Sequence, residues 1–264
     1  MTDLLTTTNL SKSFGSLLVI DSFHMNLKKG EALGIIGPNG AGKSTLFNLV
    51  TGSLSPNSGN IQFDGRDITQ MPAHDRCKAG IGRSYQIPHP FVGMTVFENL
   101  LVGAAFGGEK GEAESYDFCA QTLELSGLLE KANALAGSLT LLERKRLELA
   151  RALATRPKVL LLDEIAGGLT EHEVKELIET IKGICAEGTS IIWIEHIVHA
   201  LLSVVSRLIV INFGQKLDDG DPQVVIKSPD VQKVYMTGQW PSGPSPQSPV
   251  RSVQIRLQQC RDYL

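Results

Sequence analysis

The chain has 264 residues, of which 42% are hydrophobic and 20% are charged, and its formal net charge is −3. These values are typical of a globular protein with a full core, and the slightly acidic balance argues against nucleic-acid binding. Scattered cysteines without a C-x-x-C pair exclude a disulfide framework and a zinc site of that type, and they indicate reduced thiols. They are Cys77, Cys119, Cys185 and Cys260.

The length predicts one large domain or a domain with an inserted subdomain. The first residues lack a basic start followed by an apolar run, so no secretory leader is expected. Residues 200–213 are the most apolar long segment, but Ser203, Ser206 and Arg207 interrupt it. We expect no membrane span, so other subunits would have to cross the bilayer if the protein works at a membrane.

Residues 4–30 alternate apolar and polar positions, with turns at 13–16 and 28–30. This pattern predicts antiparallel strands. Phe14 lies in the first turn, where an exposed ring could stack on an adenine base. The alternative is an ordinary hairpin residue, and the sequence does not choose between the two.

The next stretch fits the phosphate-binding loop pattern G-x-x-x-x-G-K-[ST]. An apolar strand over 32–36 precedes it, and a helix that Gly52 closes follows it. Backbone N–H groups and the helix N-terminus would hold phosphate, Lys43 would reach the β- and γ-phosphates, and Ser44 would bind Mg²⁺. A chance match is the alternative, but strand, loop and helix together favour nucleoside triphosphate binding. The ATP-binding residues expected here are Gly37, Pro38, Asn39, Gly40, Ala41, Gly42, Lys43, Ser44 and Thr45.

Residues 53–65 predict a loop and then a strand, and residues 82–86 predict a short strand that ends before Pro88 and Pro90. Gln86 therefore lies at a hinge-like junction. Helical patterns follow over 96–102, 113–128 and from about 141, with a glycine-rich break at 107–111. No strand pattern intervenes, so a helical subdomain of about residues 87–155 is expected within the α/β core.

The core pattern resumes with an aliphatic strand over 159–162 that ends in Asp163 and Glu164. An amphipathic helix over 171–186 and a strand over 190–194 follow, and Glu195 and His196 end that strand. A hairpin over 208–217 completes the set. This alternation predicts a doubly wound parallel sheet.

Residues 239–249 are rich in proline and serine, which predicts an extended linker. Apolar residues recur at helical spacing over 250–264. A short amphipathic helix that docks on a partner or a membrane surface is one interpretation, and a frayed tail is the other.

An acidic pair after an aliphatic strand is the second nucleotide motif, in which Asp163 holds Mg²⁺ and Glu164 polarises the attacking water. On these residues the chain resembles the ATP-binding cassette (ABC) superfamily across about residues 4–238. The resemblance implies an α/β phosphate-loop NTPase cassette with an antiparallel β subdomain and the helical insert. The expected division is an ABC ATPase domain over 1–238 and a tail over 239–264.

The resemblance also implies site residues. Phe14 matches the adenine-stacking aromatic, and Gln86 matches a loop glutamine that reaches Mg²⁺ and the attacking water. His196 lies where a switch histidine is expected. The signature that contacts ATP in a partner's site corresponds to Leu139, Thr140, Leu141, Leu142 and Glu143.

Other stretches are similar to ATP-binding subunits of branched-chain amino acid importers, with urea or short-chain amides as neighbouring substrates. They are residues 82–86, 94–101, 146–154, 168–171 and 193–196. Three positions depart from the superfamily pattern: Ile165 replaces proline, Thr170 replaces aspartate, and Leu142 replaces a signature glycine. The leucine adds bulk where the backbone of a glycine approaches phosphate closely.

The resemblance implies hydrolysis of ATP with Mg²⁺ between two cassettes, with Glu164 as general base and His196 and Gln86 as positioning groups. The implied partners are a second ABC ATPase subunit (in a homodimer or heterodimer), permease subunits and, indirectly, a periplasmic or extracellular solute-binding protein. The implied place is the cytoplasmic face of the inner membrane. A soluble cassette acting on ribosomes or DNA is a rival, but it usually carries a second cassette or basic extensions. A non-hydrolysing module would lack Glu164 or His196.

Overall fold

Two β-sheets and a group of helices make up the chain, and the computed structural model describes residues 3–107 and 112–237. The first sheet is antiparallel, in the order β2-β1-β4-β5, and its long hairpin confirms the strands expected over 4–30. Leu5, Ile20 and Leu27 of this hairpin are buried, as the alternating pattern requires. The strands are β1 (Asp3–Phe14), β2 (Leu17–Lys28), β4 (Ser58–Phe63) and β5 (Arg66–Asp67).

The second sheet has six strands in the order β10-β9-β3-β8-β7-β6, all parallel except the edge strand β10. Its central strands are buried on both faces, as the aliphatic runs predict. The carboxyl ends of β3, β7 and β8 therefore meet along one edge. The strands are β3 (Ala32–Ile36), β6 (Ile81–Ser84), β7 (Val159–Asp163), β8 (Ser190–Ile194), β9 (Arg207–Asn212) and β10 (Gln215–Gly220).

Helices cover the second sheet differently on its two faces. Helix α1 (Lys43–Thr51) packs between the two sheets, where Val159 and Leu161 join its core. On the other face, Leu160 and Leu162 pack with α6 (Glu171–Ala186) and α7 (Val198–Leu202). Each aliphatic residue of β7 thus packs into one of two cores, which fixes the position of the acidic pair at the end of the strand.

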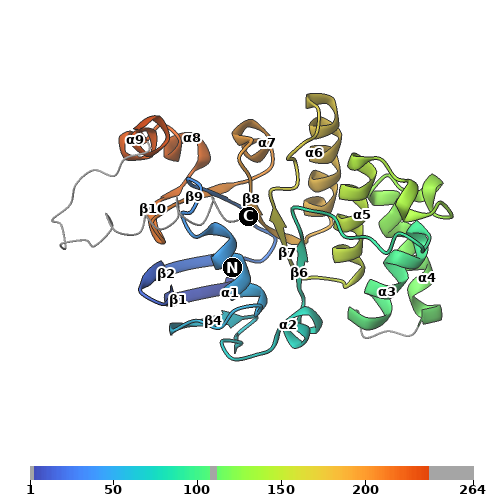
Figure 1. Cartoon of the computed structure of the whole chain (residues 1–264), viewed down its shortest axis with the longest axis horizontal. Coiled ribbons are helices and arrows are strands. Elements are labelled where there is room, and N and C mark those ends of the chain that lie inside the picture. The colour runs from blue at the N-terminus through green and yellow to red at the C-terminus, as the bar shows by residue number, and fades with distance from the viewer. Residues whose placement is uncertain (1–2, 108–111, 238–264) are drawn as a thin grey trace, which may run out of the picture.

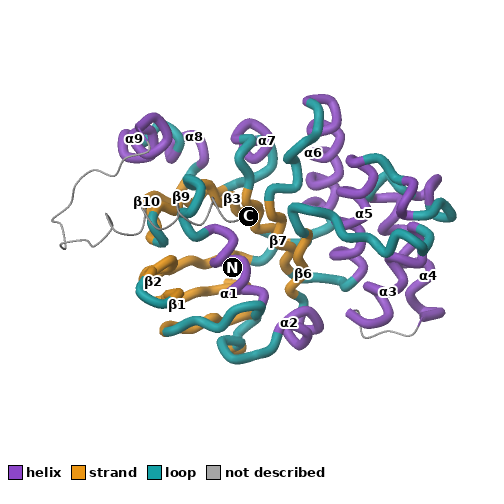
Figure 2. The backbone as a smooth tube through the Cα atoms, viewed as in Figure 1, coloured by secondary structure: helices purple, strands orange, loops and turns teal. Residues whose placement is uncertain are grey.

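Helices α3 (Val96–Gly107), α4 (Glu112–Leu125) and α5 (Leu141–Ala154) gather at one end of the molecule around a core of their own (Figure 2). They form the expected helical insert. The helix predicted to reach Leu128 instead ends at Leu125, because Gly127 adopts a left-handed φ of +68°. The hydroxyl of Ser126 also bonds back to the carbonyl of Thr122.

Several short elements lack a clear sequence pattern and were not predicted. Helices α8 and α9 lie at the end of the molecule opposite α3 and α4 (Figure 1). The helix considered for 250–264 and most of the glycine-rich break lie outside the described residues. Within the described part of the chain, no helix has both the length and the apolarity of a transmembrane span. The unpredicted elements are β5 (Arg66–Asp67), α2 (Ala73–Ala79), α7 (Val198–Leu202), α8 (Pro222–Val225), α9 (Pro229–Thr237) and the 3₁₀ turns Leu129–Lys131 and Ala136–Ser138.

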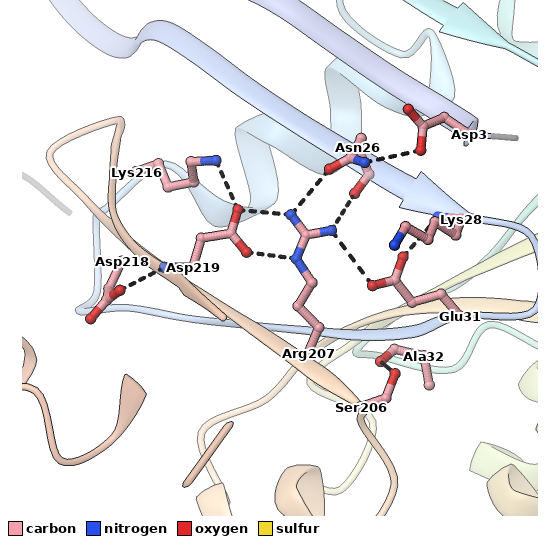
Figure 3. Close-up of polar contacts among 10 residues, drawn as sticks. All are labelled: Asp3, Asn26, Lys28, Glu31, Ala32, Ser206, Arg207, Lys216, Asp218 and Asp219. Atoms are coloured by element: carbon pink, nitrogen blue, oxygen red, sulfur yellow. Dashed lines mark hydrogen bonds and ion pairs between the residues drawn. The ribbon is translucent and has the colours of Figure 1, made fainter. Parts of the chain in front are cut away.

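One arginine joins the two sheets. The Arg207 guanidinium lies between Asp219 of β10 and Asn26 of β2 (Figure 3), and its Nε and Nη2 donate to the two carboxylate oxygens of Asp219 at 2.6 and 2.8 Å. It also donates to the backbone carbonyl of Asn26 at 3.2 Å and lies 3.5 Å from Glu31. This network fixes the first sheet against the edge of the second, and so it sets the position of the hairpin beside the phosphate loop.

We expect Arg207→Met to lower the free energy of unfolding by about 3 kcal/mol, because it leaves the shielded carboxylate of Glu31 without a cation and that of Asp219 with Lys216 alone. Urea unfolding monitored by fluorescence measures the effect. Lys216→Met is the matched control, since Lys216 contacts the same carboxylate from a more exposed position and should cost about 0–1 kcal/mol. Equal losses from the two variants would contradict the assignment.

The same link predicts a pH dependence. Although burial alone would raise the pKa of Asp219, hydrogen bonds and charge from Arg207 and Lys216 lower it. The stabilisation is therefore complete above the ordinary aspartate pKa of about 4, and it is lost as the pH falls through the lowered value. Arg207→Met should therefore remove the contribution of the Arg207–Asp219 pair to the pH dependence of the free energy of unfolding in this acidic range.

Candidate active site

The phosphate loop turns sharply between β3 and α1, and at two of its positions no residue other than glycine fits. A Cβ at Gly37 would lie 2.1 Å from the carbonyl oxygen of Ile211. Gly42 has a left-handed φ of +104°, and a Cβ there would lie 2.7 Å from the carbonyl oxygen of Val19. The loop is thus packed against β9 and β2 and continues directly into the N-terminus of α1. Backbone N–H groups at such a loop and helix N-terminus bind phosphate.

Lys43 lies over this loop. Its ammonium donates to the carbonyls of Gly37 and Pro38 at 2.8 and 2.9 Å. Burial lowers the pKa of Lys43, while the charges of Glu164 and Asp163 oppose that shift. A cavity of about 320 Å³ brings the loop and Glu164 together; it is lined by Val19, Asn39, Gly40, Gly42, Lys43, Ser44, Thr45 and Glu164.

Glu164 joins the ends of three elements. His196 Nε2 lies 2.6 Å from Glu164 Oε1, and Gln86 Nε2 donates to Oε2 at 2.8 Å. The backbone N–H of Glu164 donates to the carbonyl of Ile194 at 2.9 Å, and its φ of +48° is left-handed. A strained backbone held by packing is typical of functional positions. The three residues expected to be catalytic are therefore in direct contact beside the phosphate cavity.

Sequence reasoning missed Arg83, a charged residue within the short strand β6. Its Nη2 lies 2.6 Å from Asp163 Oδ2, and its Nη1 donates to Asn48 Oδ1 at 2.6 Å. The side chains of Arg83 and Asp163 are each only 9% exposed. The one signal in the sequence is a charged residue inside a short strand, which requires a partner if the strand is buried.

Glu195 is the second missed residue. It is buried, and its carboxylate accepts the N–H of Ala166 at 3.1 Å and that of His196 at 2.9 Å. It therefore ties the loop after Glu164 to the histidine. Buried Lys145 of α5 donates to the carbonyl of Gln86 at 3.4 Å; burial lowers its pKa, and the charge of Glu195 opposes that shift.

The residues expected to hold Mg²⁺ supply oxygen donors, the type that this cation prefers. Ser44 offers a hydroxyl in the first turn of α1, facing the cavity that Glu164 also lines. Arg83 holds one carboxylate oxygen of Asp163 and leaves the other for a ligand or a bridging water. Gln86 directs its amide nitrogen at Glu164. Ser44 and Asp163 fit the cation on their chemistry.

Phe14 and the signature residues do not line this cavity. Phe14 ends β1 with 48% of its side chain exposed, and the Lys12 ammonium lies 5.5 Å from its ring centroid. The signature residues begin α5, where Thr140 is the N-cap. Leu142 packs into the core and Leu141 is 45% exposed.

Comparisons with known proteins agree with this geometry. The ABC transporter family model matches residues 20–167. The high-affinity branched-chain amino acid transport ATP-binding protein BraF of Pseudomonas aeruginosa is 35% identical over 250 residues, covering 88% of this chain and 97% of its own length. LivG of Escherichia coli, which bears the same description, is 36% identical over 248 residues, with the same two coverages.

Solved structures extend the similarity to three dimensions. A nucleotide-free ATP-binding cassette from an ABC transporter has a TM-score of 0.81 at 31% identity, covering 89% of this chain and 99% of its own. A cassette in its ADP conformation has a TM-score of 0.82 at 30% identity, covering 90% of this chain and 100% of its own.

Proposed function

Because the chain belongs to the ABC transporter family, we propose that it is the ATP-hydrolysing subunit of an importer for branched-chain amino acids. The observation that carries hydrolysis is Glu164, held between His196 and Gln86 at the wall of the phosphate cavity. The solute rests on the two relatives described above, whose names state transport of branched-chain amino acids.

The geometry supports a division of roles. The loop N–H groups and Lys43 bind the phosphates, and Lys43 neutralises charge that develops on the γ-phosphate. Each carboxylate oxygen of Glu164 accepts from one neighbour and keeps a lone pair, so the carboxylate can take a proton from water. When bound at Ser44 and Asp163, Mg²⁺ would supply further neutralisation of phosphate charge. His196 and Gln86 orient Glu164.

Partners follow from the surface next to Gln86. Large apolar side chains are exposed after β6: Tyr85, Ile87, Phe91 and Val92 are 45% to 65% exposed. We assign this surface to a cytoplasmic segment of a permease subunit, because it adjoins the glutamine that contacts Glu164. The chain would then lie at the cytoplasmic face of the membrane, paired with a second cassette that completes each ATP site, and work with a solute-binding protein on the outer side.

A reconstituted complex tests the proposal. We expect the chain to co-purify with multispanning subunits and to drive ATP-dependent uptake of labelled leucine into vesicles when the solute-binding protein is added. Unlabelled isoleucine and valine should compete, and urea and acetamide serve as the control solutes. Competition by urea or acetamide but not by valine would show that the solute is an amide and not a branched-chain amino acid. Co-purification of the chain with ribosomes instead of membrane subunits would overturn the transporter role.

A further inference from the structure

Arg83 connects the expected metal ligand to the phosphate-loop helix. One terminal nitrogen lies 2.6 Å from Asp163 Oδ2 and the other donates to Asn48 Oδ1 at the same distance. Because the guanidinium is planar and rigid, the contact with Asn48 fixes the nitrogen that holds Asp163 Oδ2. Arg83 thereby engages one oxygen of Asp163 and leaves Oδ1 for a ligand.

Two aromatic rings also pack against the guanidinium. Arg83 Nε is buried without a hydrogen-bond partner among the described residues. The guanidinium carbon lies 5.6 Å from the ring centroid of Phe47 and 4.8 Å from that of Tyr85. Phe47 is buried in the core, whereas Tyr85 is 50% exposed. The Tyr85 side of this stack is therefore the side that a partner can reach.

A groove of about 280 Å³ opens on that side. It lies among α2, β6, α3 and α5, and both Arg83 and Tyr85 line it together with Val102 and Arg151.

We propose that Arg83 is a positioning residue that orients Asp163 for Mg²⁺, and that the Tyr85 ring supports this orientation by packing against the guanidinium. The inference rests on the proposed function, because it takes Asp163 as a metal ligand. Groups that hydrogen-bond a metal-binding carboxylate commonly change metal affinity when they are replaced. Arg83 acts through Asp163 and needs no contact with the nucleotide.

The test uses the purified full chain and ADP binding, so it does not depend on turnover. ADP affinity is measured as a function of the MgCl₂ concentration, and the readout is the concentration that gives half of the Mg²⁺-dependent gain. ADP affinity is also measured in EDTA, without Mg²⁺. We expect Arg83→Met to raise that concentration about 10- to 100-fold while binding in EDTA stays near wild type. Arg83→Lys keeps the charge but cannot span both partners, so it should show an intermediate shift in the same direction.

Tyr85 supplies a matched pair that does not disturb the core. Tyr85→Ala removes the ring and should raise the half-maximal MgCl₂ concentration severalfold, whereas Tyr85→Phe keeps the ring and should match wild type. These surface variants decide the matter if Arg83→Met does not fold. Unchanged or tighter Mg²⁺ dependence in Arg83→Lys and Tyr85→Ala would overturn the positioning role. Absence of Mg²⁺-dependent binding in the wild-type chain would instead overturn the proposed function.

Discussion

Glu164→Gln should reduce ATP hydrolysis by about 10²- to 10⁴-fold, the usual contribution of a positioned general base, and leave ATP binding intact. The change removes the negative charge from the group between His196 and Gln86 but keeps its shape. Lys43 and the loop, which we propose bind the phosphates, are untouched. If ATP joins the two cassettes and hydrolysis separates them, the variant should also dimerise more readily with ATP, which size-exclusion chromatography can measure.

The matched control is Glu171→Gln, the same change at an exposed position in the first turn of α6. It should have near-normal activity. Turnover of the purified Glu164→Gln complex close to that of Glu171→Gln would refute the assignment of Glu164 as the base. A parallel loss of ATP binding would instead mean that the variant damages the cavity.

The second sheet was predictable because its strands are buried on both faces. The runs over 159–162 and 191–194 are uninterrupted aliphatic or aromatic sequences, and each is followed by the polar residues of the site. Parallel strands place those ends at one edge of the sheet, where Glu164 and His196 are in contact. The expected resemblance to the ABC family is confirmed by the family model over residues 20–167.

Arg83 and Glu195 were not predictable in the same way. The partner of Arg83 is 80 positions away, and no periodicity indicates which acid a buried arginine meets. Glu195 accepts backbone N–H groups, a role that depends on loop geometry and leaves no mark on composition. The end of α4 was misplaced for a local reason, since the left-handed Gly127 outweighed a helical pattern that continued to Leu128.

If the partner cassette carries a glycine-rich signature, we expect the two ATP sites of the assembled complex to be unequal. Lys43→Ala should then remove most of the ATPase activity. The same change in the partner's phosphate-loop lysine should remove little of it. The site with Lys43 and Glu164 would face the partner's signature, and the other site would face the start of α5. There Thr140 and Glu143 form a closed capping box, in which the Thr140 N–H donates to Glu143 Oε2 at 2.8 Å. An N–H at this helix end is thus already occupied by a carboxylate.

The charge of Glu143 strengthens the argument. The backbone N–H of Thr140 lowers the pKa of Glu143, so the group stays ionised at neutral pH and would repel a γ-phosphate brought to the same helix N-terminus. Leu142 is turned into the core, so its bulk does not face the phosphate and charge becomes the larger obstacle. We expect Glu143→Gln to raise activity severalfold in a complex that carries Lys43→Ala, with exposed Glu130→Gln as the control. Equal losses from the two lysine substitutions would rule out unequal sites, and no gain from Glu143→Gln would show that the carboxylate is not their cause.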